Sequence, residues 1–303
     1  MCKFVVQLYH NQCFVYYILL FCSIINNMNI SSWLINATKR LKDIGISSAR
    51  LDAELILSQT MRKDRTYLHA HLDQTIDQRQ IDIADARLSL RLERVPIAYI
   101  IGYKEFFGRK FNVSPDVLIP RPESEDMISL FLELTAGDIK PKTLIDIGTG
   151  SGCLGITTAL ERPNLRVILS DVSPAALKIA AKNADELNAK VSLQEQSLLS
   201  GQFEPLDYIL ANLPYVDNSW QVSPETRHEP ASALFADKKG LELILKLIEQ
   251  IPSHLNQNGL ALLEADARQH QAIIEFAEQN GLELAAQKEM ILALRPISAE
   301  PQN

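Results

Sequence analysis

Cysteine is scarce in this chain of 303 residues, and its distribution excludes several kinds of protein. Three of the four cysteines fall within residues 1–27, and Cys153 is the only one beyond them. A disulfide framework or a Cys-based metal centre needs several cysteines spread through the fold, so neither is expected, and a reducing cytoplasm is the predicted compartment. The six histidines show no metal-ligand spacing, so no metal site is predicted.

An apolar run long enough to cross a bilayer is also missing. The densest run, residues 14–25, spans 12 positions, whereas a transmembrane helix needs about 20. Residues 1–27 contain one charged side chain, Lys3, and lack the small-residue cleavage pattern of a signal peptide. We interpret this extension as the product of an upstream start or, alternatively, as a weak interfacial anchor. No contact with a membrane is expected unless it is retained.

Positive charge is not in excess. The chain carries 30 Lys and Arg against 37 Asp and Glu, a net charge of −7. A broad nucleic-acid-binding surface normally carries surplus basic side chains, so stable nucleic-acid binding is not expected beyond a local basic patch. With 47% hydrophobic residues, the chain is long enough for two globular domains, and a monomer is the default expectation.

Three segments follow the extension. Residues 28–95 show apolar positions at helical spacing, with Ser31 or Ser32 as a helix cap, and predict a small helical domain that recognises the substrate. Residues 96–123 alternate aromatic and polar side chains and predict a β-hairpin connector. From residue 124 to 303, strand and helix patterns alternate, which predicts an α/β domain with a mostly parallel seven-stranded sheet. The last strand is expected to be antiparallel, because no helix separates it from the strand before.

A glycine-rich turn follows the first strand predicted in this α/β domain. Its glycines allow a tight turn and close approach of a ligand; the run consists of Gly148, Thr149, Gly150, Ser151 and Gly152. Asp171, at the end of the next strand, can accept hydrogen bonds from both ribose hydroxyls of an adenosine-containing cofactor. Asp146 can reach a cofactor ammonium, which favours S-adenosylmethionine. The glycine spacing also satisfies a dinucleotide fingerprint, so NAD is the competing cofactor.

The strand predicted at Leu206–Ala211 ends in a tetrad formed by Asn212, Leu213, Pro214 and Tyr215. Open α/β sheets place their chemistry at such strand ends. The side-chain carbonyl of Asn212 and the backbone carbonyl of Leu213 can accept both hydrogens of a planar NH2 group, and Tyr215 can stack on its plane. This arrangement suits methylation of an amide or amino nitrogen. The competing interpretation is a simple strand-ending turn.

These motifs resemble, in their order along the chain, those of the HemK-type release-factor glutamine methyltransferases. The resemblance includes Leu118–Glu123 and the segment Arg227-His228-Glu229-Pro230, and it runs from about Met28 to the last strand. It implies a Rossmann-like class I methyltransferase domain behind a helical domain, with S-adenosylmethionine as cofactor. The implied substrate is the glutamine of the Gly-Gly-Gln loop of bacterial peptide chain release factors, methylated on its side-chain nitrogen.

The resemblance also implies residue roles. The residues implied in cofactor binding are Asp146, Gly148, Thr149, Gly150, Ser151, Gly152, Asp171, Ser197, Leu198 and Asn212. Those implied in substrate binding and catalysis are Asn212, Leu213, Pro214 and Tyr215. Pro120, Arg121 and Glu123 would shape the cofactor pocket. Arg227 and Glu229 would brace the active-site loop, with a surface ion pair as the alternative.

Three departures from the family pattern keep other functions open. Leu213 stands where the family usually has proline, and Asn-Leu-Pro-Tyr also occurs in ribosomal-RNA adenine dimethyltransferases. Adenine-N6 methylation of RNA or DNA is therefore the alternative function. Ser197 stands where the family commonly has an acidic residue, and a short turn at Lys288-Glu289 replaces a longer polar loop. A binding module without catalysis is a third interpretation.

Overall fold

The computed structural model describes residues 28–202 and 204–298, so the interpretations of residues 1–27 lie outside the described residues. Within that part of the chain, no helix is long and apolar enough to span a membrane. The chain divides into two compact units, one ending at Ile101 and the other beginning at Gly102. The predicted division into a helical domain ending at residue 95, a connector ending at residue 123 and an α/β domain stays a prediction.

The first unit is helical, as predicted. Its elements are α2 (Ile30–Asp43), α3 (Ala49–Met61), α4 (Arg65–Ala70), α5 (Gln78–Leu92) and α6 (Ile97–Ile101). Helix α2 buries Trp33, Leu34 and Leu41 against α3 and α5, because these residues share one helix face. Helix α6 occupies the start of the segment predicted as a hairpin connector, so that part of the prediction is wrong.

The first helix is capped by Asn29, not by Ser31 or Ser32. The Asn29 side chain accepts a hydrogen bond from the Ser32 amide at 2.8 Å, and the Ser32 hydroxyl accepts one from the Asn29 amide at 3.1 Å. This reciprocal pair is a capping box in which serine takes the place usually filled by Glu or Gln. Ser32 therefore contributes to the cap from the third helical position.

Replacing Asn29 by alanine is expected to lower the free energy of unfolding of this unit by about 1 kcal/mol, because the Ser32 amide loses its side-chain acceptor. Ser31→Ala is the matched control and should change it by less than about 0.5 kcal/mol. Denaturation of the full chain, followed by fluorescence of the buried Trp33, measures both. Equal losses in the two variants would contradict the assignment of the cap.

The second unit begins with the predicted hairpin. Strands β1 (Tyr103–Phe106) and β2 (Arg109–Asn112) pair antiparallel around Phe107 and Gly108, both of which have positive φ. Such a two-residue turn matches the twist of the strands it joins. The short helices η1 (Pro122–Ser124) and α7 (Glu125–Leu134) then lead into the sheet domain.

The seven-stranded sheet has the order β5-β4-β3-β6-β7-β9-β8, in which β9 is antiparallel to both neighbours and the other pairings are parallel. This confirms the predicted mixed, mostly parallel sheet. The strands are β3 (Lys142–Ile147), β4 (Leu165–Asp171), β5 (Val191–Glu195), β6 (Leu206–Ala211), β7 (Leu255–Glu264), β8 (Leu282–Lys288) and β9 (Ile291–Pro296). The remaining helices are α8 (Cys153–Glu161), α9 (Pro174–Leu187), η2 (Pro224–His228), η3 (Ala231–Ala233), α10 (Asp237–Gly240), α11 (Glu242–His254) and α12 (His270–Gln279).

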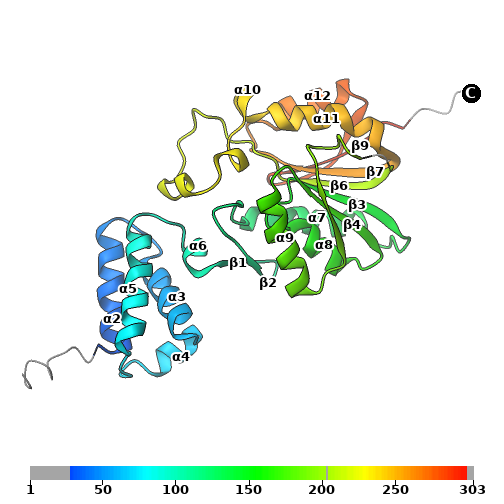
Figure 1. Ribbon diagram of the computed structural model, residues 1–303. Helices are drawn as coiled ribbons and strands as arrows, with labels where there is room; N and C mark the ends of the chain where they lie inside the picture. Colours follow the sequence, from blue (N-terminus) through cyan, green and yellow to red (C-terminus); the bar gives the residue numbers. More distant parts are fainter. Residues whose placement is uncertain (1–27, 203, 299–303) are drawn as a thin grey trace, which may run out of the picture. The chain divides into compact units, whose positions relative to one another are not determined.

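Helices cover both faces of this sheet (Figure 1). Leu144 and Tyr208 lie in the core formed with α7, α8 and α9, whereas Ile145 and Ile209 lie in the core formed with α11 and α12. Neighbouring residues of a strand point to opposite faces, so a strand buried on both sides reads as a continuous apolar run. Strand β6 shows such a continuous apolar run in the sequence at its last four residues.

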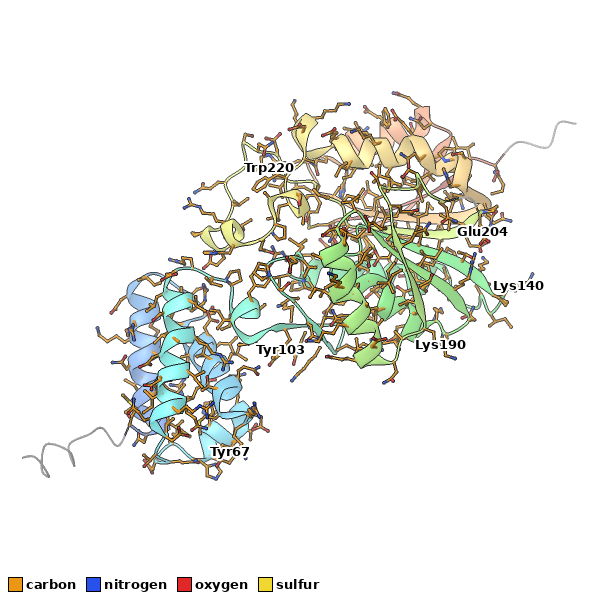
Figure 2. All side chains as sticks on the ribbon, viewed as in Figure 1. Tyr67, Tyr103, Lys140, Lys190, Glu204 and Trp220 are labelled. Carbon is orange, nitrogen blue, oxygen red and sulfur yellow. The ribbon has the colours of Figure 1, made fainter. Side chains whose placement is uncertain are left out.

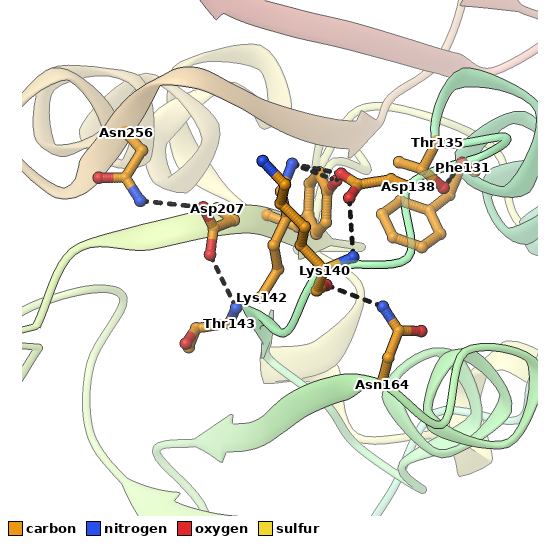
Figure 3. Close-up of polar contacts among 10 residues, drawn as sticks. Phe131, Thr135, Asp138, Lys140, Lys142, Thr143, Asn164, Asp207 and Asn256 are labelled. Atoms are coloured by element: carbon orange, nitrogen blue, oxygen red, sulfur yellow. Dashed lines mark hydrogen bonds and ion pairs between the residues drawn. The ribbon is translucent and has the colours of Figure 1, made fainter.

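Polar contacts fasten the amino-terminal ends of β3 and β6, opposite the end at which the glycine-rich turn lies (Figure 3). The Asp207 carboxylate accepts hydrogen bonds from the Thr143 amide at 2.8 Å and from the Asn256 amide at 3.0 Å. Asp138 forms an ion pair with Lys142 at the start of β3. These contacts fix the register of the two strands whose other ends carry the motifs.

Candidate active site

A pocket of about 250 Å³ opens at the carboxyl ends of β3, β4 and β6. Parallel strands bring their carboxyl ends together, which is where α/β folds bind ligands. The predicted site residues that line the pocket are Pro120, Arg121, Gly148, Thr149, Gly150, Ser151, Asp171, Ser197, Leu198, Asn212, Leu213 and Pro214. The described residues contain no cluster of His, Cys, Asp and Glu that could hold a metal ion.

The glycine-rich turn has a conformation that side chains resist. Gly148, Gly150 and Gly152 have φ of +67°, +55° and +82°. A Cβ atom on Gly148 would lie 3.1 Å from the side chain of Leu213, so the turn packs directly against the tetrad. The glycines thus allow the turn and the end of β6 to close on one pocket.

Asp146 lies beneath this turn and does not line the pocket. One carboxylate oxygen accepts hydrogen bonds from the Thr149 hydroxyl at 2.6 Å and from the Gly155 amide at 2.9 Å. The other oxygen is buried and has no partner among the described residues. Burial raises the pKa of Asp146 to about 6, against the opposing effect of these two hydrogen bonds.

The position of Asp146 separates the two cofactors that the glycine spacing allows. Gly155 belongs to the first turn of α8, where a dinucleotide would seat its pyrophosphate on free amides. Here a carboxylate already accepts the Gly155 amide. Its negative charge disfavours a second anion and favours a cationic group above the turn, as S-adenosylmethionine carries.

Asp171 is held with its carboxylate at the pocket. Its two oxygens accept the amides of Gly150 at 3.0 Å and of Ser173 at 2.9 Å, one each. A carboxylate has about four acceptor positions, so each oxygen keeps a free lone pair. Asp171 therefore has the acceptors that the hydroxyls of a ribose require, and the pocket residues fit an adenosine-containing cofactor.

Asn212 extends from β6 into the pocket wall. Its Nδ2 donates a hydrogen bond to the Ser124 hydroxyl at 3.0 Å. Among the described residues, no group donates to Asn212 Oδ1 or to the Leu213 carbonyl. Asn212 and Leu213 both line the pocket, and the binding of a planar NH2 group by their two oxygens stays a prediction.

Tyr215 is anchored from two sides. Its hydroxyl donates to Glu264 Oε1 at 3.2 Å, and its backbone carbonyl accepts a hydrogen bond from Gln269 at 2.8 Å. A Cβ atom on Gly240 would lie 1.9 Å from that carbonyl, so only glycine fits there. Tyr215 lies beside the pocket and is not among the residues of its wall. Its role in stacking on a substrate stays a prediction.

The comparisons with known proteins cover both units. The sequence model of the PrmC N-terminal domain matches residues 32–102, and that of the methyltransferase small domain matches residues 126–233. A release factor glutamine methyltransferase of Koribacter versatilis is 38% identical over 235 residues, which cover 76% of this chain and 83% of that protein. This chain belongs to the release factor glutamine methyltransferase family. A second member, from Coxiella burnetii, is 35% identical over 255 residues, or 84% of this chain and 89% of that protein.

Some relatives of the family are longer. A bifunctional methyltransferase of Rickettsia felis is 33% identical over 287 residues, and the chain spans about half of its length, 54%. Among solved structures, the hMettl16 catalytic domain in complex with a MAT2A 3′UTR hairpin has a TM-score of 0.50 at 16% identity, covering 71% of this chain and 83% of that one. That likeness shows the fold, and together with the family it confirms the predicted methyltransferase class.

The two segments of the family pattern that flank the tetrad meet through an ion pair. Glu229, whose side chain is 2% exposed, pairs with Arg121 at 2.6 Å and accepts the Ile119 amide at 3.1 Å. Glu229 therefore joins the segment after η2 to the segment before η1, as a brace would. Arg227 is exposed and has no hydrogen bond or ion pair with a described residue, so the structure does not bring it to this contact.

The segment after the tetrad is tied down at a second place. Trp220 lies on the stretch between β6 and α10 (Figure 2). The guanidinium of Arg268 lies 3.6 Å from the centroid of its ring. Arg268 follows β7, so this contact links the segments after two neighbouring strands. Glu123, by contrast, is exposed and does not line the pocket. Its implied role in shaping the pocket stays a prediction.

Two residues of the site could not be identified from the sequence. Ser124 and Glu264 are both 1% exposed, and they contact Asn212 and Tyr215 respectively. The available signal for Glu264 is a single charged residue closing an apolar strand, Leu260–Glu264, next to β6. Ser124 gives no signal, because a serine after Pro-Glu at a helix start reads as an ordinary cap.

Proposed function

We propose that this enzyme methylates the side-chain amide nitrogen of the glutamine in the Gly-Gly-Gln loop of bacterial peptide chain release factors. The methyl donor would be S-adenosylmethionine, and the enzyme would act in the cytoplasm as a monomer. The observation that carries the proposal is the pair of acceptors at the pocket, Asn212 Oδ1 and the Leu213 carbonyl. The names of the relatives in the family support the choice of substrate. We propose further that residues 28–95 recognise the release factor.

The cofactor would be held by residues of the turn and of the neighbouring strand ends. Asp171 offers acceptors for the ribose hydroxyls, and Leu198 and Ser197 line the part of the pocket beyond β5. Asp146 supplies negative potential from below the turn. When bound, S-adenosylmethionine supplies an activated methyl group on a sulfonium. The protein therefore has to position an acceptor nitrogen and does not have to activate the donor.

Residues 212–215 would compensate for the low reactivity of the glutamine amide nitrogen. An amide nitrogen is a poor nucleophile because its lone pair is delocalised into the carbonyl. Hydrogen bonds from its NH2 group to Asn212 and Leu213 fix the nitrogen in place and favour localisation of the lone pair. No strong base lies in the tetrad, so orientation of the amide is the main contribution of these residues.

Binding of S-adenosylmethionine is expected to weaken as the pH falls through 6. Burial raises the pKa of Asp146 to about 6, so below this pH its carboxyl is mostly protonated and attracts a cation only after losing a proton. Between pH 7 and pH 5 the ionised fraction falls about tenfold, and the dissociation constant should rise by about that factor. Calorimetric titrations across this range measure it. Asp146→Asn should flatten the dependence, and an unchanged slope in that variant would assign it to other groups.

The full chain, incubated with S-adenosylmethionine and a purified bacterial release factor, tests the proposed function. Mass spectrometry of the Gly-Gly-Gln peptide should show one added methyl group on the glutamine. Asn212→Ala enzyme and a release factor that lacks this glutamine are the two controls, and neither should give the modified peptide. An unmodified peptide from an enzyme that binds the cofactor would contradict the proposal, and ribosomal RNA is then the next substrate to assay.

A further inference from the structure

Glu264 is a buried carboxylate that the chemistry described above does not use. It ends β7, and the pairing of Ala211 with Leu263 in the parallel ladder places Glu264 beside Asn212. The residue is 1% exposed, and its Oε2 has no hydrogen-bond partner among the described residues. It is therefore an unpaired acceptor next to the residue that is expected to bind the substrate amide.

Three hydrogen-bond donors lie near Glu264. The Tyr215 hydroxyl donates to its Oε1 at 3.2 Å. Burial raises the pKa of Glu264, and the Ser124 hydroxyl, the Tyr215 hydroxyl and the Asn212 amide oppose that rise. An ionised carboxylate can only accept hydrogen bonds. When Glu264 is ionised, the hydroxyl and NH2 groups beside it are therefore best placed as donors toward it.

This polarity determines which end of the Asn212 amide faces the pocket. Asn212 Nδ2 donates to the Ser124 oxygen at 3.0 Å, and the Ser124 proton is then free to point toward Glu264. With its NH2 turned inward, Asn212 has only its carbonyl oxygen left for the pocket. A flipped amide would place its oxygen on the side of the carboxylate, and it could keep the contact with Ser124 only by accepting the Ser124 proton, which would then no longer point toward Glu264.

We infer that Glu264 is a positioning residue that selects a substrate NH2 group, because it holds the Asn212 amide with its carbonyl oxygen toward the pocket. The inference rests on the proposed function. A substrate glutamine offers hydrogens to this oxygen, whereas a glutamate in the same place offers a carboxylate that the oxygen repels. Glu264 also anchors the Tyr215 hydroxyl, but the selection of the NH2 group works through Asn212, so the effect on the preference for glutamine should disappear when Asn212 is removed.

Glu264→Gln is the informative variant, because it keeps the shape of the side chain and replaces one acceptor by a donor. Its NH2 group can donate to Ser124 and compete with Asn212 for that oxygen, which frees the Asn212 amide to turn. We expect kcat for release-factor methylation to fall by about 10- to 100-fold. The dissociation constant of S-adenosylmethionine should change by less than about threefold, because the variant leaves the glycine turn and Asp171 intact.

Substrate discrimination separates this role from a general structural one. Binding is measured with a purified release factor and with its variant in which the loop glutamine is glutamate. We expect Glu264→Gln to reduce the preference for glutamine about tenfold. Asp266→Asn is the matched control, because it removes a neighbouring negative charge that does not contact Asn212 or Ser124, and it should keep the wild-type preference. In an Asn212→Ala background, Glu264→Gln should have no further effect on the preference for glutamine.

Failure of the proposed function and failure of the role of Glu264 give different results. If the wild-type enzyme leaves the release factor unmethylated, the proposed function fails and the inference fails with it. If the wild-type enzyme methylates it and Glu264→Gln keeps both its kcat and its preference, only the role of Glu264 is overturned. Should Glu264→Gln not fold, Ser124→Ala tests the same role, because it removes the hydroxyl that accepts the Asn212 NH2 group beside Glu264. It should show the same loss of preference for glutamine. Wild-type preference in Ser124→Ala would then overturn it.

Discussion

Replacing Asn212 by alanine is expected to lower kcat for release-factor methylation by about 10²- to 10³-fold, the usual loss when one preorganised hydrogen bond to a reacting group is removed. The same change should alter the dissociation constant of S-adenosylmethionine by less than about threefold, because Asp171 and the glycine turn remain in place. The reason is that Asn212 supplies one of the two oxygens that hold the substrate NH2 group. Single-turnover kinetics with saturating cofactor, alongside calorimetric binding, separates the two quantities.

Asn218→Ala provides a matched control for this prediction. Asn218 lies six positions further along the same segment and is exposed, and its side chain donates a hydrogen bond to Asp237 at 3.4 Å. It should retain kcat within about twofold, as surface substitutions usually do. A comparable loss in both variants would show that the segment as a whole, and not the Asn212 oxygen, limits the reaction. A large rise in the cofactor dissociation constant for Asn212→Ala would instead make it mainly a cofactor ligand.

The sheet domain could be predicted closely from the sequence because its signals are local and agree with one another. Strand β6 has the bounds that the pattern predicts, Leu206–Ala211, and the alternation predicted after residue 124 corresponds to helices such as α8, α9 and α12 between the strands. Each is an apolar run ended by a turn or a cap. The antiparallel last strand follows from connection length alone, since parallel neighbours need a crossover.

Where local signals conflict, the prediction was wrong. Helix α6, Ile97–Ile101, has the β-branched composition of a strand, yet it forms one short helical turn after Pro96. The cap of α2 was placed at serine because serine is a common cap, whereas Asn29 precedes Ser32 by the three residues that a capping box needs. The capping-box spacing is a local signal that the sequence does contain, whereas the helical turn of α6 goes against the β propensity of its residues.

Site residues that follow a strand directly could be predicted from the sequence. Site residues that are buried away from the pocket and contact those residues could not. Asp171 lies at the end of β4 and Asn212 follows β6 directly. Because alternating strands and helices form a parallel sheet, the carboxyl ends of these strands lie together at one pocket. Asp146 was expected at the cofactor but lies under the turn, because the tight path of the glycines brings the Gly155 amide back onto its carboxylate. Ser124 and Glu264 meet Asn212 only through the pairing of β6 with β7 and the return of η1, and both are long-range features.

Asp171→Ala is expected to weaken S-adenosylmethionine binding by about 10²-fold. Two hydrogen bonds from ribose hydroxyls to a charged acceptor are worth about 3 kcal/mol together, which corresponds to that factor. The variant also leaves the Gly150 and Ser173 amides without the acceptor that now orients the turn. Calorimetric titration measures the loss. Asp171→Asn should lose less, because its remaining carbonyl oxygen still accepts one hydrogen bond.

The control for Asp171→Ala is Asp185→Ala, an exposed carboxylate on α9 that changes the net charge equally. It should bind the cofactor within about twofold of wild type, because an exposed charge at a distance is largely screened. Equal weakening in the two variants would assign the effect to the charge of the domain. Weakening confined to Asp171 assigns it to the carboxylate whose two oxygens each hold one backbone amide and keep one lone pair for the ligand.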